Sequence, residues 1–394
     1  MGHTIEIAEF LLLVAAIVGV LARRLRIPYS VGLVLAGIAL AFVPFSADVT
    51  LTKDLIFTTL LPPLVFEAAF QLPWKPLRRD LPVILLLATG GVLLAAALTA
   101  VGMHYVAGWT WMAAVVFGIL IAATDPVSVI ATFKESGIRD RLRLLIEAES
   151  LFNDGTAAVA FGIAVTMALG QNYSAFDLAS TLAITAGGGI LCGAAVAGAV
   201  LLLAGPATDH LVELAFTTVA AYGSFLLAEH FHLSGILATV TAGIMLGNLG
   251  HLGAITNKGR EAVEAFWEFA AFVANSLIFL LLGLQLAHQS FSALWLPAAA
   301  AIVIVILGRA LAVYPICWLF SRSALRVGMR YQNLLFWGGL RGALALALAL
   351  GLPLEMPLRE DIITVSFAVV VSSIFLQGLT IPPLLRRGVA RERG

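Results

Sequence analysis

The sequence has 394 residues, of which 61% are hydrophobic and 12% are charged, and its mean hydropathy is +1.01. Soluble domains carry about 45–50% apolar and about 25% charged residues, so this composition excludes an ordinary soluble protein. The formal net charge is zero, and no basic region could neutralise phosphates, which argues against a nucleic-acid partner. We therefore predict a polytopic integral membrane protein.

Apolar runs, separated by short polar breaks, follow one another along the whole chain. A membrane-spanning helix needs about 17–25 mostly apolar residues, so each run suits one crossing. The runs lie at 4–22, 29–45, 54–70, 81–102, 111–133, 143–169, 177–204, 209–229, 232–248, 262–288, 294–320, 332–351 and 361–385. The fold class is therefore predicted to be all-α with about 13 transmembrane helices, and an odd number places the two ends on opposite sides.

The basic residues indicate the orientation in the membrane. Of the 23 Lys and Arg residues, 19 fall in loops on one side, and only Lys53 and Arg359 fall on the other. Arg309 and Arg341 lie inside apolar runs. Because cytoplasmic loops are enriched in Lys and Arg, we expect a multi-pass protein of the cell inner (plasma) membrane. Its N-terminus would be outside, and residues 387–394 would form a short cytoplasmic tail.

Five ionisable residues lie deep inside predicted helices, where each is costly unless it is paired or hydrated. They are Glu67, Asp125, Glu149, Asp154 and Arg341. Four carboxylates against one guanidinium suit a small cation or protons. No phosphate-binding loop of the G-x-x-x-x-G-K-[ST] type occurs, so neither a nucleotide partner nor a cofactor is expected.

The run Thr124-Asp125-Pro126 predicts a break in the helix over 111–133. Pro126 has no N–H, so the carbonyl of Ala122 loses its helical partner, and Thr124 is disfavoured in helical dihedrals. Free carbonyls beside a carboxylate at membrane depth are typical of ion sites in secondary transporters. A simple proline kink with a hydrogen-bonded Asp125 is the alternative.

A second polar cluster follows in the helix over 143–169. Ser150 and Asp154 are four residues apart and share one face, and Asn153 adds an amide beside them. Hard oxygen atoms of this kind suit Na⁺ or Li⁺. Glu149 points elsewhere, and we expect it to pair with Arg341, since an unpaired arginine at mid-membrane is prohibitive.

Three glycines surround Arg341 and predict a second local break, in the run Gly338-Gly339-Leu340-Arg341-Gly342. Two broken helices suggest an inverted repeat. Glu67 follows Pro62-Pro63 and is either a gate, a ligand that acts directly or through another group, or a hydrated cavity residue. The partner of Arg309 stays open.

Three motifs together resemble those of a known family: TDPVSV (124–129), ESLFNDGTA (149–157) and GGLRGALA (338–345). They resemble the monovalent cation:proton antiporter family, in its bacterial and archaeal sodium–proton antiporter branch, which is related to animal sodium–proton exchangers. The resemblance covers essentially the whole chain. It implies the sodium–proton antiporter fold, an inverted repeat with two crossed unwound helices.

The resemblance also implies a homodimer in lipid, with one part of each protomer moving in an elevator-like alternating-access cycle. The dimerisation helices would lie at about 1–53 and 177–260, and the core helices at about 54–169 and 262–386. The cation and proton ligands implied are Asp154, Asp125, Ser150, the Thr124 carbonyl and, directly or through water, Glu67. The residues that would organise this Na⁺ site are Asn153, Pro126 and the ion pair Glu149–Arg341.

The implied function is antiport of Na⁺ or Li⁺ against H⁺, which serves pH homeostasis and is not an enzymatic activity. Asn153 stands where the electrogenic branch has a second aspartate, and 262–288 contains no Lys or Arg, so the resemblance favours electroneutral one-for-one exchange. Other possibilities are a K⁺/H⁺ antiporter or organic-ion exchanger of the same fold, and a cation channel with a continuous pore. An intramembrane aspartyl protease is disfavoured, because Asn153, Pro126 and Arg341 have no part in that chemistry.

Overall fold

The computed structural model describes residues 2–25, 27–42, 51–127, 129, 130, 133, 141–204, 209–252, 254–289 and 293–390. In these ranges all regular structure is helical, as predicted. The one β-type contact among them is an isolated antiparallel bridge between Asp125 and Leu340. The last tail residues, 391–394, lie outside the described part.

The helices follow the predicted order closely. They are α1 (Gly2–Leu25), α2 (Tyr29–Leu40), the π-helical turn η2 (Leu55–Leu60) with α3 (Leu61–Gln71), α4 (Trp74–Leu86), the π-helical turn η3 (Leu87–Gly91), α5 (Val92–Ala107), α6 (Trp111–Ala122), α8 (Arg141–Ala168), α9 (Ala175–Ala204), α10 (His210–His230), α11 (Gly235–Leu249), α12 (Asn257–Ala287), α13 (Trp295–Leu319), α14 (Met329–Trp337), α15 (Ala343–Leu350) and α16 (Arg359–Ala390).

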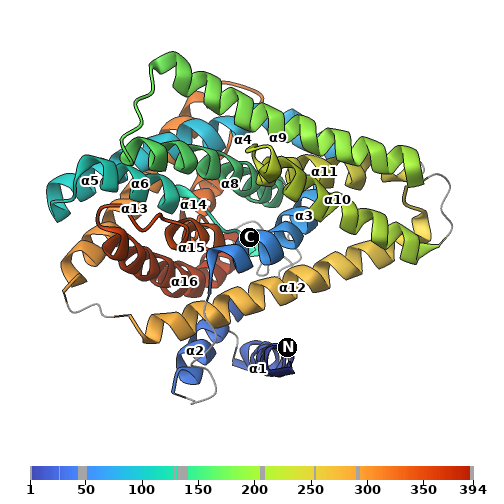
Figure 1. The fold of residues 1–394 in the computed structure, drawn as a ribbon, viewed down its shortest axis with the longest axis horizontal. Helices are drawn as coiled ribbons and strands as arrows, with labels where there is room; N and C mark the ends of the chain where they lie inside the picture. Colours follow the sequence, from blue (N-terminus) through green and yellow to red (C-terminus); the bar gives the residue numbers. More distant parts are fainter. Residues whose placement is uncertain are drawn as a thin grey trace.

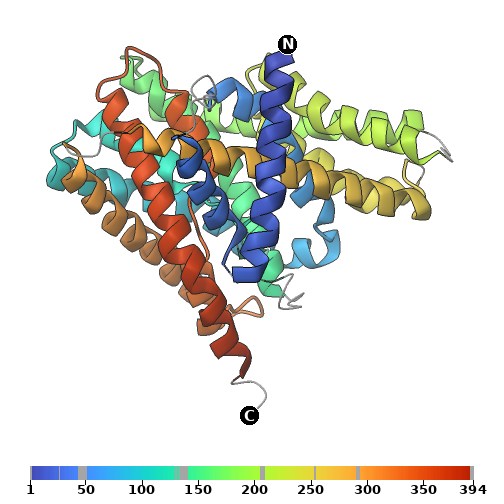
Figure 2. The same ribbon diagram turned by 90° about the horizontal axis from the view of Figure 1, so that it is seen from below.

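Seven of the described helices are long and apolar enough to cross a membrane, and four shorter apolar helices accompany them. This count treats α4, η3 and α5 as one continuous helix. Helix α1 is a twelfth segment, and the interrupted pair α14 and α15 together form the thirteenth in the described ranges. Figure 2 shows α1 beginning and α16 ending at opposite sides of the molecule, as an odd number requires.

Helix α4 begins at Trp74, seven residues before the predicted start at 81. The prediction followed apolar runs and assigned the charged residues of this stretch to a loop. In the structure Asp80 is buried and accepts hydrogen bonds from Arg141 of α8, the shortest at 2.7 Å. Arg141 also donates to the carbonyls of Leu325 and Arg326 before α14, at 2.9 Å each. The polar end of α4 is thus fastened inside the protein.

The helices form two bundles. Figure 1 shows α5, α6, α13 and α16 on the left and α10 and α11 on the right, with α9 and α12 running along the length of the molecule and α1 and α2 at its lower edge. The crossover bundle comprises residues 74–168 and 295–390: α5 packs against α6 and α13, and α8 packs against α4 and α6. The flanking bundle comprises residues 2–71 and 175–287: α11 packs against α3, α9 and α10, and α12 packs against α2 and α3. Each bundle therefore combines a segment from each half of the chain.

Helices α3 and α12 pack mainly within the flanking bundle, although the predicted core ranges included both. The contact of α12 with α2 is especially close. A Cβ on Gly37 would lie 2.1 Å from the carbonyl oxygen of Leu280, and one on Gly283 would lie 2.2 Å from that of Val34. Only glycine permits this backbone-to-backbone approach, which is a common mode of helix packing in membranes.

Candidate functional site

Helix α6 breaks where the sequence predicted. The helix ends at Ala122, and neither Ala123 nor Thr124 is helical. Pro126 follows the bridged residue Asp125. Because Pro126 has no N–H, the Ala122 carbonyl has no helical donor. Two other groups replace that donor: the Asn153 side chain, at 3.3 Å, and the Arg341 guanidinium, at 2.7 Å. The break is therefore stabilised by side chains from other helices.

The second break lies between α14 and α15 and crosses the first. The backbone N–H of Asp125 donates to the carbonyl of Leu340 at 2.8 Å, which forms the antiparallel bridge. Gly342 is essential to the crossing, because a Cβ there would lie 2.1 Å from Asp125 Oδ2. The carboxylate of Asp125 accepts hydrogen bonds from the backbone N–H groups of Val127 and Ala343. The two predicted unwound helices are thus confirmed.

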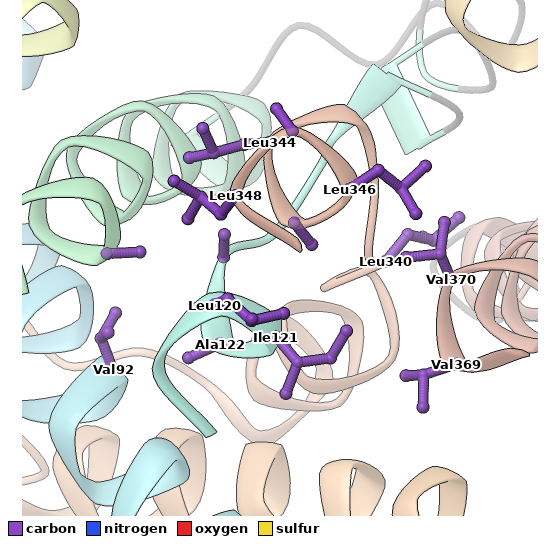
Figure 3. Close-up of a cluster of buried hydrophobic side chains, with 14 of the residues drawn as sticks. Val92, Leu120, Ile121, Ala122, Leu340, Leu344, Leu346, Leu348, Val369 and Val370 are labelled. Carbon is purple, nitrogen blue, oxygen red and sulfur yellow. The ribbon is translucent and has the colours of Figure 1, made fainter. Parts of the chain in front are cut away.

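Buried hydrophobic side chains surround the crossing, as Figure 3 shows for its labelled residues. They come from α5, α6, α15, α16 and the second break: Val92, Leu120, Ile121, Ala122, Leu340, Leu344, Leu346, Leu348, Val369 and Val370. Hydrogen bonds and charges in such dry surroundings act more strongly than they do in water. The hydrogen bonds and charges at the crossing are therefore stronger than the same interactions would be at a hydrated surface.

Helix α8 brings its polar residues against the break in α6. The Ser150 hydroxyl donates to the carbonyl of Thr124, and the two side-chain hydroxyls lie 3.4 Å apart. The amide nitrogen of Asn153 lies 3.2 Å from Thr124 Oγ1 and 3.3 Å from Glu149 Oε1. The side chains of Ser150 and Asn153 are buried. The predicted neighbours Thr124, Ser150 and Asn153 do meet, and they join α6 to α8.

Two oxygen atoms of this cluster have no hydrogen-bond partner among the described residues. They are Asp154 Oδ1 and Asn153 Oδ1, and both atoms are buried. In the described part of the chain, no three His, Cys, Asp or Glu residues are grouped as ligands for a metal ion. The oxygen atoms gathered here come instead from carboxylates, an amide, hydroxyls and a main-chain carbonyl, a set suited to a hard monovalent cation.

Glu67 lies on α3, in the other bundle, and its side chain is half-buried. Its Oε1 accepts a hydrogen bond from Gln71, one turn further along the same helix. Because Gln71 also accepts a hydrogen bond from Arg143 of α8, Glu67 lies one turn away from a contact between α3 and α8.

The predicted ion pair between Glu149 and Arg341 is wrong. Glu149 pairs with Arg309 of α13, whose Nη1 and Nη2 donate to the two carboxylate oxygens at 2.8 and 2.9 Å. Arg341 donates instead to the carbonyls of Ala122 and Ala123, at 2.7 and 3.2 Å. Both arginines are at least 95% buried. Arg309 is therefore paired with a carboxylate, although its Nε has no partner among the described residues, and Arg341 donates to carbonyls at the α6 break.

Two spatial features explain this exchange of partners. Arg341 lies in the unwound segment that touches the α6 break, so the free carbonyls are its nearest acceptors. Gly339 leaves room for Arg309, because a Cβ there would lie 2.6 Å from Arg309 Nε. The sequence did signal Arg309 as a charge inside an apolar helix, but gave no partner for it. Ser373, which accepts from the Arg341 N–H at 2.8 Å, carried no signal.

The profile of the family described as "Sodium/hydrogen exchanger, transmembrane" matches residues 11–387. The chain belongs to the sodium/hydrogen exchanger family. A similar member, the Na⁺/H⁺ antiporter ApNhaP of Aphanothece halophytica, is 36% identical over 364 residues, which cover 92% of this chain and 70% of that protein. The low-affinity Na⁺/H⁺ antiporter NhaS1 of Synechocystis is 38% identical over 363 residues, with coverage of 90% and 68%.

The fold of this exchanger family member is also found in a solved structure. The sodium proton antiporter MjNhaP1 from Methanocaldococcus jannaschii superposes with a TM-score of 0.77 at 21% identity, over 97% of this chain and 98% of that one. The predicted antiporter family and fold class are confirmed. The chain is accordingly a multi-pass membrane transporter and not an enzyme.

Proposed function

We propose that this exchanger carries Na⁺ or Li⁺ in exchange for H⁺ across the plasma membrane, with Asp154 as the ligand that both ions share. The observation that carries the proposal is the pair of buried oxygens, Asp154 Oδ1 and Asn153 Oδ1, without a donor in the described chain. Buried polar atoms nearly always have partners, and a cation supplies the partner that these two lack. The Na⁺/H⁺ antiporters among the relatives support the choice of ions.

The other ligands in this proposal are Asp125, the Ser150 hydroxyl and the Thr124 carbonyl, with Glu67 contributing directly or through water. In the state described, Ser150 donates to the Thr124 carbonyl, so these two oxygens are joined by a hydrogen. Binding of Na⁺ requires the hydroxyl to rotate, so that both oxygens face the ion. The carboxylate of Asp125 is oriented by a hydrogen bond that it accepts from the N–H of Val127, at 2.9 Å.

Competition for Asp154 gives the mechanism of exchange. A carboxylate that holds a proton has lost the charge that attracts Na⁺, so the site carries one ion or the other. We expect the apparent KM for Na⁺ to rise about tenfold for each pH unit below the apparent pKa of the site, as simple competition requires. Initial rates of Na⁺-driven proton release, measured from pH 5 to pH 9, check this. An apparent KM independent of pH would contradict a shared ligand.

We infer one-for-one, electroneutral exchange from two features of the charge distribution. The position before Asp154 is Asn153, whose amide bonds to the α6 break and adds no charge. Residues 262–288 contain no Lys or Arg that could release a second proton. A single negative charge is then left to be balanced by a single monovalent ion.

For the transport cycle we propose elevator-like movement of the crossover bundle, which holds the ion ligands except Glu67, against the flanking bundle. The flanking bundle would form the homodimer through the helices at about 1–53 and 177–260. We assign α3 and α12 to the flanking bundle as well, because they pack there. The boundary between the moving and fixed parts would then run between α3 and α8.

The experiment is the collapse of a preset pH gradient in proteoliposomes on addition of Na⁺, Li⁺, K⁺ or choline. Valinomycin and K⁺ clamp the voltage in the Na⁺ and Li⁺ runs. Collapse driven by Na⁺ or Li⁺, unchanged by the clamp and abolished in Asp154→Asn, is the expected result. Asp209→Asn is the matched control, because Asp209 caps α10, its contact with His210 is exposed, and Asn caps equally well.

Each other outcome has a definite meaning. If K⁺ alone collapses the pH gradient, then K⁺ is the substrate in place of Na⁺ or Li⁺, and the mechanism of exchange stays as proposed. Acceleration by voltage would contradict electroneutral exchange. A cation conductance that persists in Asp154→Asn, without coupled proton movement, would overturn antiport and favour a channel.

A further inference from the structure

A short chain of polar side chains crosses from the flanking bundle to the crossover bundle. Arg143 of α8 donates from Nη2 to Gln71 Oε1 of α3 at 3.2 Å. The amide nitrogen of Gln71 in turn donates to Glu67 Oε1. The amide oxygen of Gln71 therefore bonds across the boundary between the bundles, and its amide nitrogen bonds to the proposed ligand Glu67.

The charge of Arg143 is balanced on its own helix. Its Nε donates to Glu147 Oε1, one turn further along α8, at 2.8 Å, and the two side chains are 19% and 12% exposed. The contact across the boundary is thus made to a neutral amide. When it opens, Arg143 keeps its carboxylate, and no charge is left unpaired in a poorly hydrated place.

Two other ion pairs of the crossover bundle are different in this respect. Asp80–Arg141 and Glu149–Arg309 join two charged groups, and both partners lie within the crossover bundle. Separation of either pair would strand a buried charge. Pairs of that kind suit contacts that persist, whereas a neutral amide suits a contact that must open and close.

The position of this contact relates it to the ion site. On α8, Arg143, Glu147 and Asp154 follow at spacings of four and seven residues, which place them along one face. On α3, Glu67 and Gln71 are four residues apart and share a face as well. The proposed ion ligand Asp154 therefore lies on the same face of α8 as Arg143, which makes the contact with Gln71.

We propose that Gln71 is a breakable latch between the two bundles, and that it positions Glu67 while it is closed. The latch rests on the proposed movement of one bundle against the other. Opening the Arg143–Gln71 hydrogen bond would accompany each transport cycle and release α8 from α3.

The test strengthens the latch instead of removing it. Gln71→Glu gives Arg143 a charged partner across the boundary, so that opening now separates two charges. We expect the maximal exchange rate to fall about fivefold or more, with a much smaller change in the apparent KM for Na⁺. A rate within about twofold of the unaltered protein would overturn the latch.

A double-mutant cycle separates the latch from simple repulsion between the new carboxylate and Glu67. In an Arg143→Gln background no ion pair can form across the boundary, so Gln71→Glu should no longer slow exchange. Equal slowing in both backgrounds would assign the effect to Glu67 and overturn the latch. Gln171→Glu is the matched control: Gln171 Oε1 accepts from the exposed Tyr173 hydroxyl, a carboxylate oxygen accepts there too, and the rate should stay unchanged.

A readout without transport keeps this test distinct from that of the proposed function. If the unaltered protein exchanges no cation, the proposed function fails, and hydrogen–deuterium exchange still decides about the contact. Backbone amides at the end of α3 and the start of α8 should exchange more slowly in Gln71→Glu than in the unaltered protein. Equal or faster exchange there would overturn the latch independently.

Discussion

The two breaks that meet at the crossing are made in opposite ways. In α6, Pro126 has no N–H to donate to the Ala122 carbonyl, and the N–H of Val127 donates to Asp125 Oδ1 and not to the Ala123 carbonyl. In the segment between α14 and α15, the absence of side chains allows Asp125 to lie close to Gly342 and Arg309 to lie close to Gly339. The first break thus exposes hydrogen-bond acceptors, and the second provides space for side chains of neighbouring segments.

This difference shows how two interrupted helices can stabilise each other in a membrane. Arg341, from the glycine-rich break, donates to both carbonyls that the proline break exposes. The Leu340 carbonyl in turn accepts from the N–H of Asp125. Lipid offers no hydrogen bonds, so each break must find its partners within the protein. Either break alone would leave buried polar groups unsatisfied.

The largest effect is expected from breaking the ion pair beside the glycine-rich segment. Glu149→Gln leaves the buried Arg309 without a counter-charge, which should destabilise the protein by about 3–5 kcal/mol. Thermal or denaturant unfolding in detergent measures this. Glu264→Gln is the control, since its pair with Arg260 is exposed and worth about 0–1 kcal/mol. Recovery in the double variant Glu149→Leu with Arg309→Met would confirm the cause, and a loss below about 1 kcal/mol for Glu149→Gln would contradict it.

A smaller effect should follow from filling the space at the crossing. Gly342→Ala places a methyl group against Asp125 Oδ2, and overpacking of this kind destabilises by about 1–3 kcal/mol. Because Asp125 is displaced, we also expect the apparent KM for Na⁺ to rise. Gly198→Ala in α9 is the control, since a Cβ there meets nothing within 4 Å. Equal unfolding curves for the two variants would show that the close approach at Gly342 is unnecessary.

The smallest change in stability should come from the proline itself. Pro126→Ala restores an N–H that can compete with Arg341 for the Ala122 carbonyl, so the helix can partly re-form at a net change of about 1 kcal/mol or less. Exchange should nevertheless slow, because the carbonyls beside Asp125 become engaged. Pro315→Ala tests a proline inside α13, away from the crossing, and should leave the rate unaltered. Full activity of Pro126→Ala would mean that the free carbonyls are unnecessary.

Local rules predicted the breaks but not the partners of the arginines. Pro126 and the glycines around Arg341 act through the backbone within a few residues, so both interruptions could be predicted from the sequence. The resemblance to the antiporter family, and not a local rule, implied that Ser150 and Asn153 lie at one site with Thr124, and the structure brings the three together. Glu149 pairs with Arg309 and not with Arg341. This pairing depends on how α13 packs against Gly339, and no pattern along the chain contains that information. The packing of α3 and α12 is equally a property of distant contacts.

The ends of the interrupted helices also carry partial charges, which bear on the balance of charge at the site. The carbonyl end of α6 is negative and is compensated by Arg341, whereas the amino end of α15 is positive and meets the carboxylate of Asp125. Both helix dipoles are therefore matched by groups of the protein itself. Asp154 lies inside α8 and not at either of these helix ends, which supports its proposed role as the ligand that the two ions share.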